Sequence, residues 1–74
     1  MRYEDFELVI TSPVNLEKLV CEIYYKNEII AEISQETENL VIEIFSSQNG
    51  EWWTFPLAHF QEALEKAKKH LLGK

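Results

Sequence analysis

The chain has 74 residues, with 13 Asp and Glu against 7 Lys and Arg, so its formal net charge is −6 at pH 7. This length predicts a single domain, residues 1–74, with a small core. Cys21 is the only cysteine, which excludes an intrachain disulfide and favours a reducing, cytoplasmic setting. We expect neither a signal peptide nor a membrane span, because no apolar run approaches roughly 18 residues.

Alternating apolar and polar residues predict the first part of the chain as strands. Residues 4–11, for example, place Phe6, Leu8 and Ile10 on one side and charged residues between them. Asn49–Gly50 lies between two strand-like runs and predicts a two-residue type I′ hairpin, in which both positions have positive φ. The predicted strands span about residues 4–11, 17–26, 29–35, 40–48 and 51–55.

The last part of the chain predicts one amphipathic helix over about residues 57–72. Pro56 suits the first helical turn, and Gly73 suits the residue that ends a helix. Between them, Leu57, Phe60, Leu64, Ala67 and Leu71 recur at spacings of three and four residues. The predicted fold class is therefore α+β, a five-stranded antiparallel meander with this helix packed on one face as a two-layer sandwich.

The hairpin register predicts which residues the helix covers. A turn at 49–50 pairs Ile44 with Phe55 and places Trp53 on their face, whereas Trp52 lies on the other. A three-residue turn at 26–28 pairs Tyr25 with Ile29. The predicted covered face then consists of Phe6, Leu8, Ile10, Leu19, Cys21, Ile23, Ile29, Ala31, Ile33, Leu40, Ile42, Ile44, Trp53 and Phe55.

The opposite face has no second helix to cover it, and glutamates alternate there with apolar residues. We predict a partner-binding site on this face, since exposed aromatic residues are frequent in binding hot spots. Three interpretations stay open: a solvated face, a homodimer interface, or a site for a basic partner protein. Strand addition at an open sheet edge is a further route. The candidate residues are the anchors Trp52, Phe45 and Tyr24 and the acids Glu7, Glu22, Glu32 and Glu43; Val9, Val20, Ile30 and Val41 share their face.

Charge is unevenly distributed along the chain. Residues 1–65 hold three basic residues and all thirteen acidic ones, a net charge of −10, whereas the last nine residues carry four lysines. Such an acidic body disfavours nucleic-acid binding, which needs a basic surface. The lysines at 66–74 are explained by a solvated helix end, where cations complement the helix dipole.

Residues that would support catalysis or metal binding are few. His59 and His70 lie three helical turns apart, roughly 16 Å, so they cannot share a metal ion, and Glu62 adds at most one ligand. Cys21 is predicted to be a buried apolar residue rather than a nucleophile. The two glycines fall at turn and cap positions, so there is no phosphate-binding loop. We therefore expect neither enzymatic activity nor a cofactor.

Two stretches, "CEIYYKNEIIAEISQE" at 21–36 and "FQEALEKAKKHL" at 60–71, are similar to a family of small bacterial proteins. The chain resembles the immunity proteins of bacterial toxin systems, which bind and neutralise a cognate toxin domain. The resemblance implies a binding role without catalysis. We expect a cytoplasmic immunity protein that occludes a basic toxin domain; the alternative is a homodimeric bacterial protein of structural or regulatory role.

Overall fold

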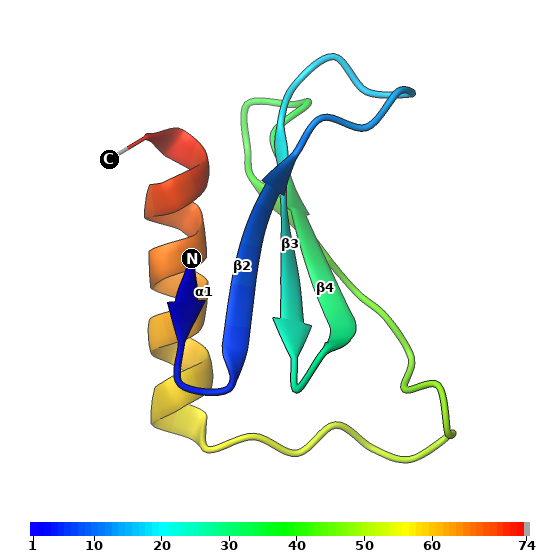
Figure 1. Cartoon of the computed structure of the whole chain (residues 1–74). Helices are drawn as coiled ribbons and strands as arrows, with labels where there is room; N and C mark the ends of the chain where they lie inside the picture. The colour runs from blue at the N-terminus through cyan, green and yellow to red at the C-terminus, as the bar shows by residue number, and fades with distance from the viewer. Residues whose placement is uncertain (74) are drawn as a thin grey trace.

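The computed structural model describes residues 1–73, so Lys74, the last of the C-terminal lysines, lies outside the described part. Five antiparallel strands form one sheet in the order β1-β2-β3-β4-β5, and a single helix, α1, lies against one side of it (Figure 1). The predicted α+β meander with a C-terminal helix is confirmed. The elements are β1 Arg2–Tyr3, β2 Phe6–Thr11, β3 Val20–Tyr25, β4 Glu28–Ser34, β5 Val41–Ile44 and α1 Leu57–Leu72.

The strand predicted at 51–55 is wrong. Gly50 donates its N–H to the carbonyl of Ser47 at 3.2 Å, and of the two turn residues only Gly50 has positive φ, so no type I′ hairpin forms. The Asn49 side chain instead accepts the N–H of Glu51 at 3.1 Å. β5 accordingly ends at Ile44 rather than near residue 48, and the chain from there to α1 runs without regular structure.

Segment 51–56 closes one end of the core with its aromatic side chains. The Phe55 ring lies 5.4 Å from Phe6, 4.7 Å from Tyr25 and 4.9 Å from Phe60, centroid to centroid. Trp53 stacks on Phe55 at 5.9 Å. These contacts place the Phe55 ring against Phe60 of α1. In a strand paired beyond β5, the same ring would lie at the sheet edge, further from α1. The segment therefore crosses the end of the sheet to reach α1 (Figure 1).

The N-terminus supplies the fifth strand in its place. The predicted strand 4–11 begins later, at Phe6, because residues 4–5 form a turn in which Glu4 has φ 53°. Arg2 and Tyr3, which precede this turn, pair with Glu7 and Phe6. The terminal ammonium of Met1 extends this pairing, because it donates to the carbonyl of Leu8 at 3.0 Å.

The turn between β3 and β4 differs from the predicted three-residue turn. Lys26 and Asn27 both have positive φ, so a two-residue turn pairs Tyr25 with Glu28. A register shift follows, and Ile30 is the extra residue of a β-bulge. Beyond it the predicted pairs Ile23–Ala31 and Cys21–Ile33 are confirmed. The bulge explains why Ile29 faces outward with Tyr24, and why Ile30 is buried although it was predicted to face outward.

Helix α1 has the predicted bounds. Pro56 precedes it and accepts the N–H of Phe60 at 3.0 Å, while Gly73, with φ 74°, ends it in the left-handed conformation. Ala63, Ala67 and Leu71 are the buried positions. Leu57, predicted as part of the apolar stripe, is exposed at the first turn.

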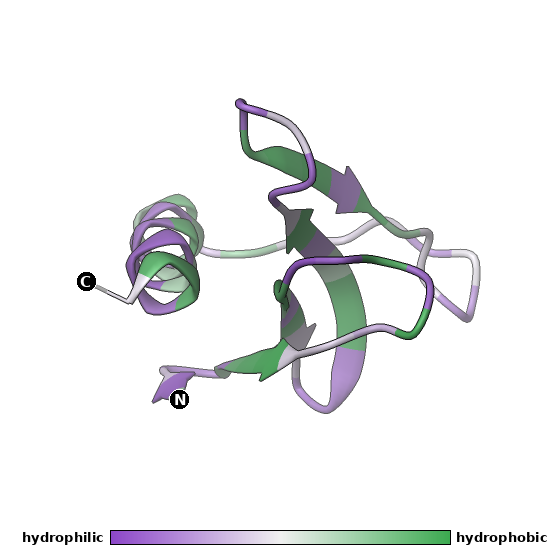
Figure 2. Cartoon of the chain, turned by 90° about the horizontal axis from the view of Figure 1, so that it is seen from above, coloured by the Kyte–Doolittle hydropathy of each residue, from purple (hydrophilic) through white to green (hydrophobic). Residues whose placement is uncertain are grey.

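α1 contacts β2 and β3 and leaves the β5 side of the sheet uncovered. A helix is about 10–12 Å across and strands lie about 4.8 Å apart, so one helix covers two or three strands. Ile42 and Ile44 of β5, predicted to be covered, are therefore exposed. Leu19, also predicted to be covered, directly precedes β3 and is exposed as well. Val20, predicted on the open face, is buried at the end where segment 12–19 extends on the side opposite α1 (Figures 1 and 2). The buried core is Phe6, Leu8, Val20, Cys21, Ile23, Ile30, Ala31, Ile33, Ala63, Ala67 and Leu71.

Candidate functional site

Three of the predicted glutamates lie side by side on the face opposite α1. Glu22 on β3 pairs with Glu32 on β4, and Glu32 pairs with Glu43 on β5. Directly opposed residues of an antiparallel pair have Cβ atoms about 4.5–5.5 Å apart, close enough for like charges to repel. Among residues 1–73 the ion pairs are Arg2–Glu7 and Lys66–Glu62, so no cation pairs with this acidic row of Glu22, Glu32 and Glu43.

The middle carboxylate of the acidic row, Glu32, lies between two other carboxylates. Partial burial raises the pKa of Glu32, and the negative charges of Glu22 and Glu43 on either side raise it further. All three effects disfavour the ionised form. A cation brought to this row would offset the repulsion and part of the desolvation.

Tyr24 and Glu7 occupy the neighbouring cross-strand row. Glu7 on β2 pairs with Tyr24 on β3, and its carboxylate lies 3.9 Å from the guanidinium of Arg2. The Tyr24 hydroxyl donates to the carboxylate of Glu22 at 3.1 Å, which joins the two rows. Burial raises the pKa of Tyr24, and the hydrogen bond to Glu22 adds to the shift, so the hydroxyl stays a neutral donor. Together Glu7, Glu22, Tyr24, Glu32 and Glu43 form one acidic face.

The two remaining candidates lie outside the strands that carry this face. Phe45 directly follows β5 and is half-buried, and its carbonyl accepts the indole N–H of Trp53 at 2.8 Å. Trp52 is 94% exposed on the segment after the Asn49–Gly50 turn and belongs to no ring pair among the described residues. The predicted position of Trp52 on the open face of the sheet is wrong, because it required a strand at 51–55. Trp53 packs against the core as predicted. It does so by stacking on Phe55, and not as a residue on the covered face of a strand.

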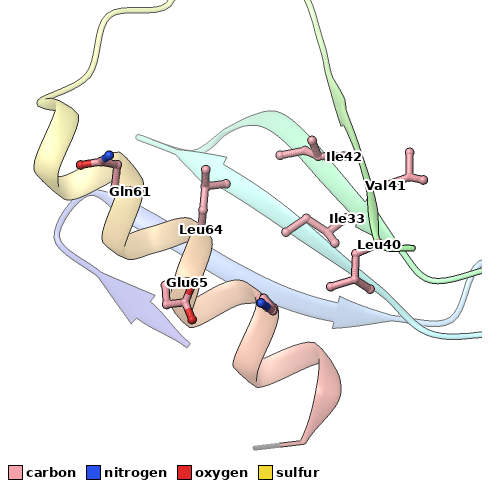
Figure 3. A pocket seen from close by; sticks show the side chains of 8 residues that line it. Ile33, Leu40, Val41, Ile42, Gln61, Leu64 and Glu65 are labelled. Carbon is pink, nitrogen blue, oxygen red and sulfur yellow. The ribbon is translucent and has the colours of Figure 1, made fainter. Parts of the chain in front are cut away.

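An apolar groove lies between α1 and the β5 edge of the sheet. The sequence patterns did not predict it. Ile42 is 40% exposed and Ile44 is 64% exposed, although both face the helix side. Figure 3 shows Leu64 on α1 pointing toward Ile33, Leu40 and Ile42 across this gap. The signal available in the sequence was the mismatch between one helix and five strands. The β5 groove, of about 380 Å³, is lined by Ile33, Leu40, Val41, Ile42, Gln61, Leu64, Glu65 and Lys68.

Cys21 and His59, considered above for catalysis and metal binding, pack against other side chains. Burial raises the pKa of the Cys21 thiol to about 11, so it is a protonated core side chain at neutral pH. His59 packs edge-on against the Tyr3 ring at 6.1 Å. Within residues 1–73, no three His, Cys, Asp or Glu side chains lie together as a metal site. No helix in this part of the chain has the length and apolarity to cross a membrane.

We compared the chain with known proteins. No family model matches it, and searches of curated proteins and of solved structures find no match either. The surfaces that the fold leaves open are consequently the basis for a functional proposal: the acidic face on one side of the sheet and the β5 groove on the other.

Proposed function

We propose that this chain is a cytoplasmic protein-binding module whose acidic face binds a basic partner domain. The observation that carries the proposal is the acidic row, in which three glutamates face one another across β3, β4 and β5 without a paired cation. Like charges placed directly opposite destabilise a sheet. The acidic row therefore destabilises the free protein, and a partner that supplies positive charge would remove this repulsion.

The acidic face has the composition of an electrostatic binding surface. Complementary charge steers a basic partner toward the face and fixes its orientation. Tyr24 adds an aromatic side chain at the centre, where its hydroxyl is held by Glu22. Trp52, exposed on the adjoining segment, and Phe45 are peripheral apolar contacts for a partner that extends beyond the sheet.

We further propose that the partner is a toxin domain and that binding neutralises it, as in the immunity proteins that residues 21–36 and 60–71 resemble. A toxin that acts on nucleic acid or another anionic substrate needs basic groups to bind it. Glutamates that pair with those groups would block substrate access without any catalytic step.

Co-expression with the products of the neighbouring reading frames tests this proposal. We expect one of them to be toxic alone, to be tolerated with this chain, and to bind it in isothermal titration calorimetry. The triple variant Glu22→Gln, Glu32→Gln, Glu43→Gln should weaken binding at least about tenfold, because charge-assisted contacts are lost.

A matched control removes the same charge elsewhere. Glu4, Glu17 and Glu38 are exposed, and their carboxylates make no hydrogen bond or ion pair among the described residues. Replacing all three with Gln should change affinity by less than about threefold. Equal losses in the two triple variants would show that net charge, rather than the acidic face, determines binding.

A homodimer is the second candidate, and the exposure of Ile42 and Ile44 favours it, since a second copy could cover them. Static light scattering tests it directly. A monomer at micromolar concentration excludes a stable dimer, whereas a dimer that persists in high salt would favour apolar self-association over the acidic-face proposal.

A further inference from the structure

The backbone of β5 presents unpaired hydrogen-bonding groups at the sheet edge. Phe45 donates its N–H to the carbonyl of Ile30 at 2.8 Å, which makes them a hydrogen-bonded pair in the β4–β5 ladder. Bonded and non-bonded pairs alternate along an antiparallel ladder, so Glu43 bonds to β4 while Ile42 and Ile44 point their N–H and C=O groups away from it. Within residues 1–73, no backbone hydrogen bond from another segment reaches these groups.

The opposite edge of the sheet is formed by a shorter strand. β1 has two residues, and both bonds of Met1, which precedes it, point inward to Leu8 of β2. α1 lies beside this edge, where His59 packs on the Tyr3 ring and the Lys66 ammonium lies 5.2 Å from the centroid of the same ring. Of the two edge strands, β5 is therefore the longer one and the one without α1 side chains packed on its residues.

The two faces of β5 specify what an added strand would carry. On the helix side, Ile42 and the β5 groove offer an apolar surface with Leu64 across it (Figure 3). On the other side, Glu43 ends the acidic row. Side chains of a strand alternate between the faces, so an added strand that places apolar residues beside Ile42 and Ile44 places its intervening residue beside Glu43.

We infer that β5 binds an extended segment of a partner protein by strand addition, and that this segment alternates apolar and basic residues. The inference rests on the proposed binding function and specifies the element and the sequence pattern that it recognises. Backbone bonds to Ile42 and Ile44 hold the segment, the β5 groove takes its apolar side chains, and a lysine or arginine extends the acidic row with a positive charge.

A second copy of the chain suits this edge less well than a basic segment. An antiparallel pairing of two β5 strands about a twofold axis, with both helices on the same side, can place Glu43 opposite Glu43. The two acidic rows would then join into a row of six carboxylates, although Glu32 is already disfavoured as an anion by burial and by its two neighbours. Charge complementarity therefore selects the basic segment as the occupant.

Synthetic peptides test the inference. The probe is the capped hexapeptide Lys-Val-Lys-Val-Lys-Val, long enough to span the four residues of β5, and the first control is the block peptide Lys-Lys-Lys-Val-Val-Val. The inference predicts that titration followed by NMR moves the resonances of residues 41–44 with the alternating peptide. It also predicts at least about tenfold weaker binding of the block peptide, which has the same charge but the wrong alternation.

Backbone methylation of the probe separates strand addition from simple charge attraction. The valine N–H groups face Ile42 and Ile44 in the predicted pairing, whereas the lysine N–H groups face away from β5. N-methylation of the valines should weaken binding at least about tenfold, and N-methylation of the lysines by less than about threefold. Equal effects of the two modifications, or resonance changes at β1 and β2 instead, would overturn the inference.

The protein offers a matched pair of variants. Ile44→Pro removes an outward N–H without removing a bond to β4, a substitution that edge strands accept. Ile44→Ala shortens the same side chain and keeps the N–H. We expect the proline variant to bind the alternating peptide at least about threefold more weakly than the alanine variant, with equal thermal midpoints showing that both are folded. Equal binding by two folded variants would overturn the inference.

The outcomes also distinguish this inference from the proposed function. If the acidic-row triple variant loses the partner domain and Ile44→Pro retains it, strand addition is wrong and the acidic-face proposal stands. If neither variant affects the partner domain, both are wrong. A wild-type chain that dimerises, and that becomes monomeric in Ile44→Pro, would show that a second copy occupies the edge.

Discussion

Ile23 and Ile44 flank Ala31 in one cross-strand row and face the same side of the sheet, yet Ile23 is fully buried and Ile44 is 64% exposed. The residue type and the face are the same. What differs is the distance from α1, which contacts β2 and β3. A single helix cannot cover five strands, so the covered half of the sheet provides the core and the β5 half stays available.

The open half is distinctive on both of its faces. One face has the apolar β5 groove, and the other has the end of the acidic row. A small chain that could have covered these residues with a second helix exposes them instead. The covered strands therefore provide the core, whereas β5 is the uncovered edge on which the proposed binding depends, and each of the following predictions compares these two regions or tests one of them.

The same substitution in the two halves should have very different costs. Ile23→Ala removes fully buried methyl groups and should lower the free energy of unfolding by about 3–4 kcal/mol, whereas Ile44→Ala should lower it by less than about 1 kcal/mol. Urea denaturation of both variants measures the difference. Similar costs would mean that Ile44 is covered in solution.

Thiol reactivity should separate the two ends of a second row, Cys21–Ile33–Ile42. Burial raises the pKa of Cys21 from 9.0 to about 11, so at pH 8 roughly a hundredfold less thiolate is present than for an unperturbed thiol. A cysteine placed by Ile42→Cys in a Cys21→Ala background is partly exposed and should react with a disulfide reagent at least about a hundredfold faster than Cys21. Comparable rates would show that the covered half opens readily.

The adjacent tryptophans should also differ. Trp53 stacks on Phe55 and donates to the carbonyl of Phe45, so Trp53→Ala should cost about 2–3 kcal/mol, below the value for a fully buried ring. Trp52 is 94% exposed, and Trp52→Ala should change stability by less than about 0.5 kcal/mol. Thermal and urea denaturation provide the test, and equal large losses would contradict the placement of Trp52.

The acidic row should give a small pH dependence of stability. The pKa of Glu32 is raised in the folded protein by burial and by Glu22 and Glu43, so the folded state binds this proton more tightly than the unfolded chain. Its contribution to stability is present below the unfolded pKa and is lost as pH rises through the folded pKa. Glu32→Gln should weaken this dependence, measured by urea denaturation from mildly acidic to neutral pH. Glu38→Gln, on an exposed turn, is the control and should leave it unchanged.

Much of the fold follows from patterns within single segments. Period-two alternation predicts β2, β3 and β4, and the spacing from Leu57 to Leu71 between Pro56 and Gly73 predicts α1 with its bounds. The acidic row was predicted for the same reason, because its members share one parity. Alternation, however, predicts only the face of the sheet on which a residue lies. It does not predict how many strands the helix covers on that face.

The incorrect parts depend on packing or on single-residue shifts. Asn49–Gly50 is a strong local turn signal, but burying Trp53 and Phe55 at the end of the sheet overrides it. The bulge leaves Ile30 buried although the alternation predicts it on the open face, and no local sequence pattern predicts the bulge. The open β5 groove follows from the position of α1 relative to the sheet, which only the three-dimensional structure provides.

Amide hydrogen exchange along β5 tests the central claim most directly. In the free chain, the amides of Ile42 and Ile44 should exchange rapidly and that of Glu43 slowly, because only Glu43 bonds to β4. Saturation with the Lys-Val-Lys-Val-Lys-Val peptide should slow the Ile42 and Ile44 amides while leaving Glu43 nearly unchanged. Protection of Ile42 and Ile44 in the free monomer, or no change in their exchange when the peptide is bound, would contradict the assignment of β5 as the binding edge.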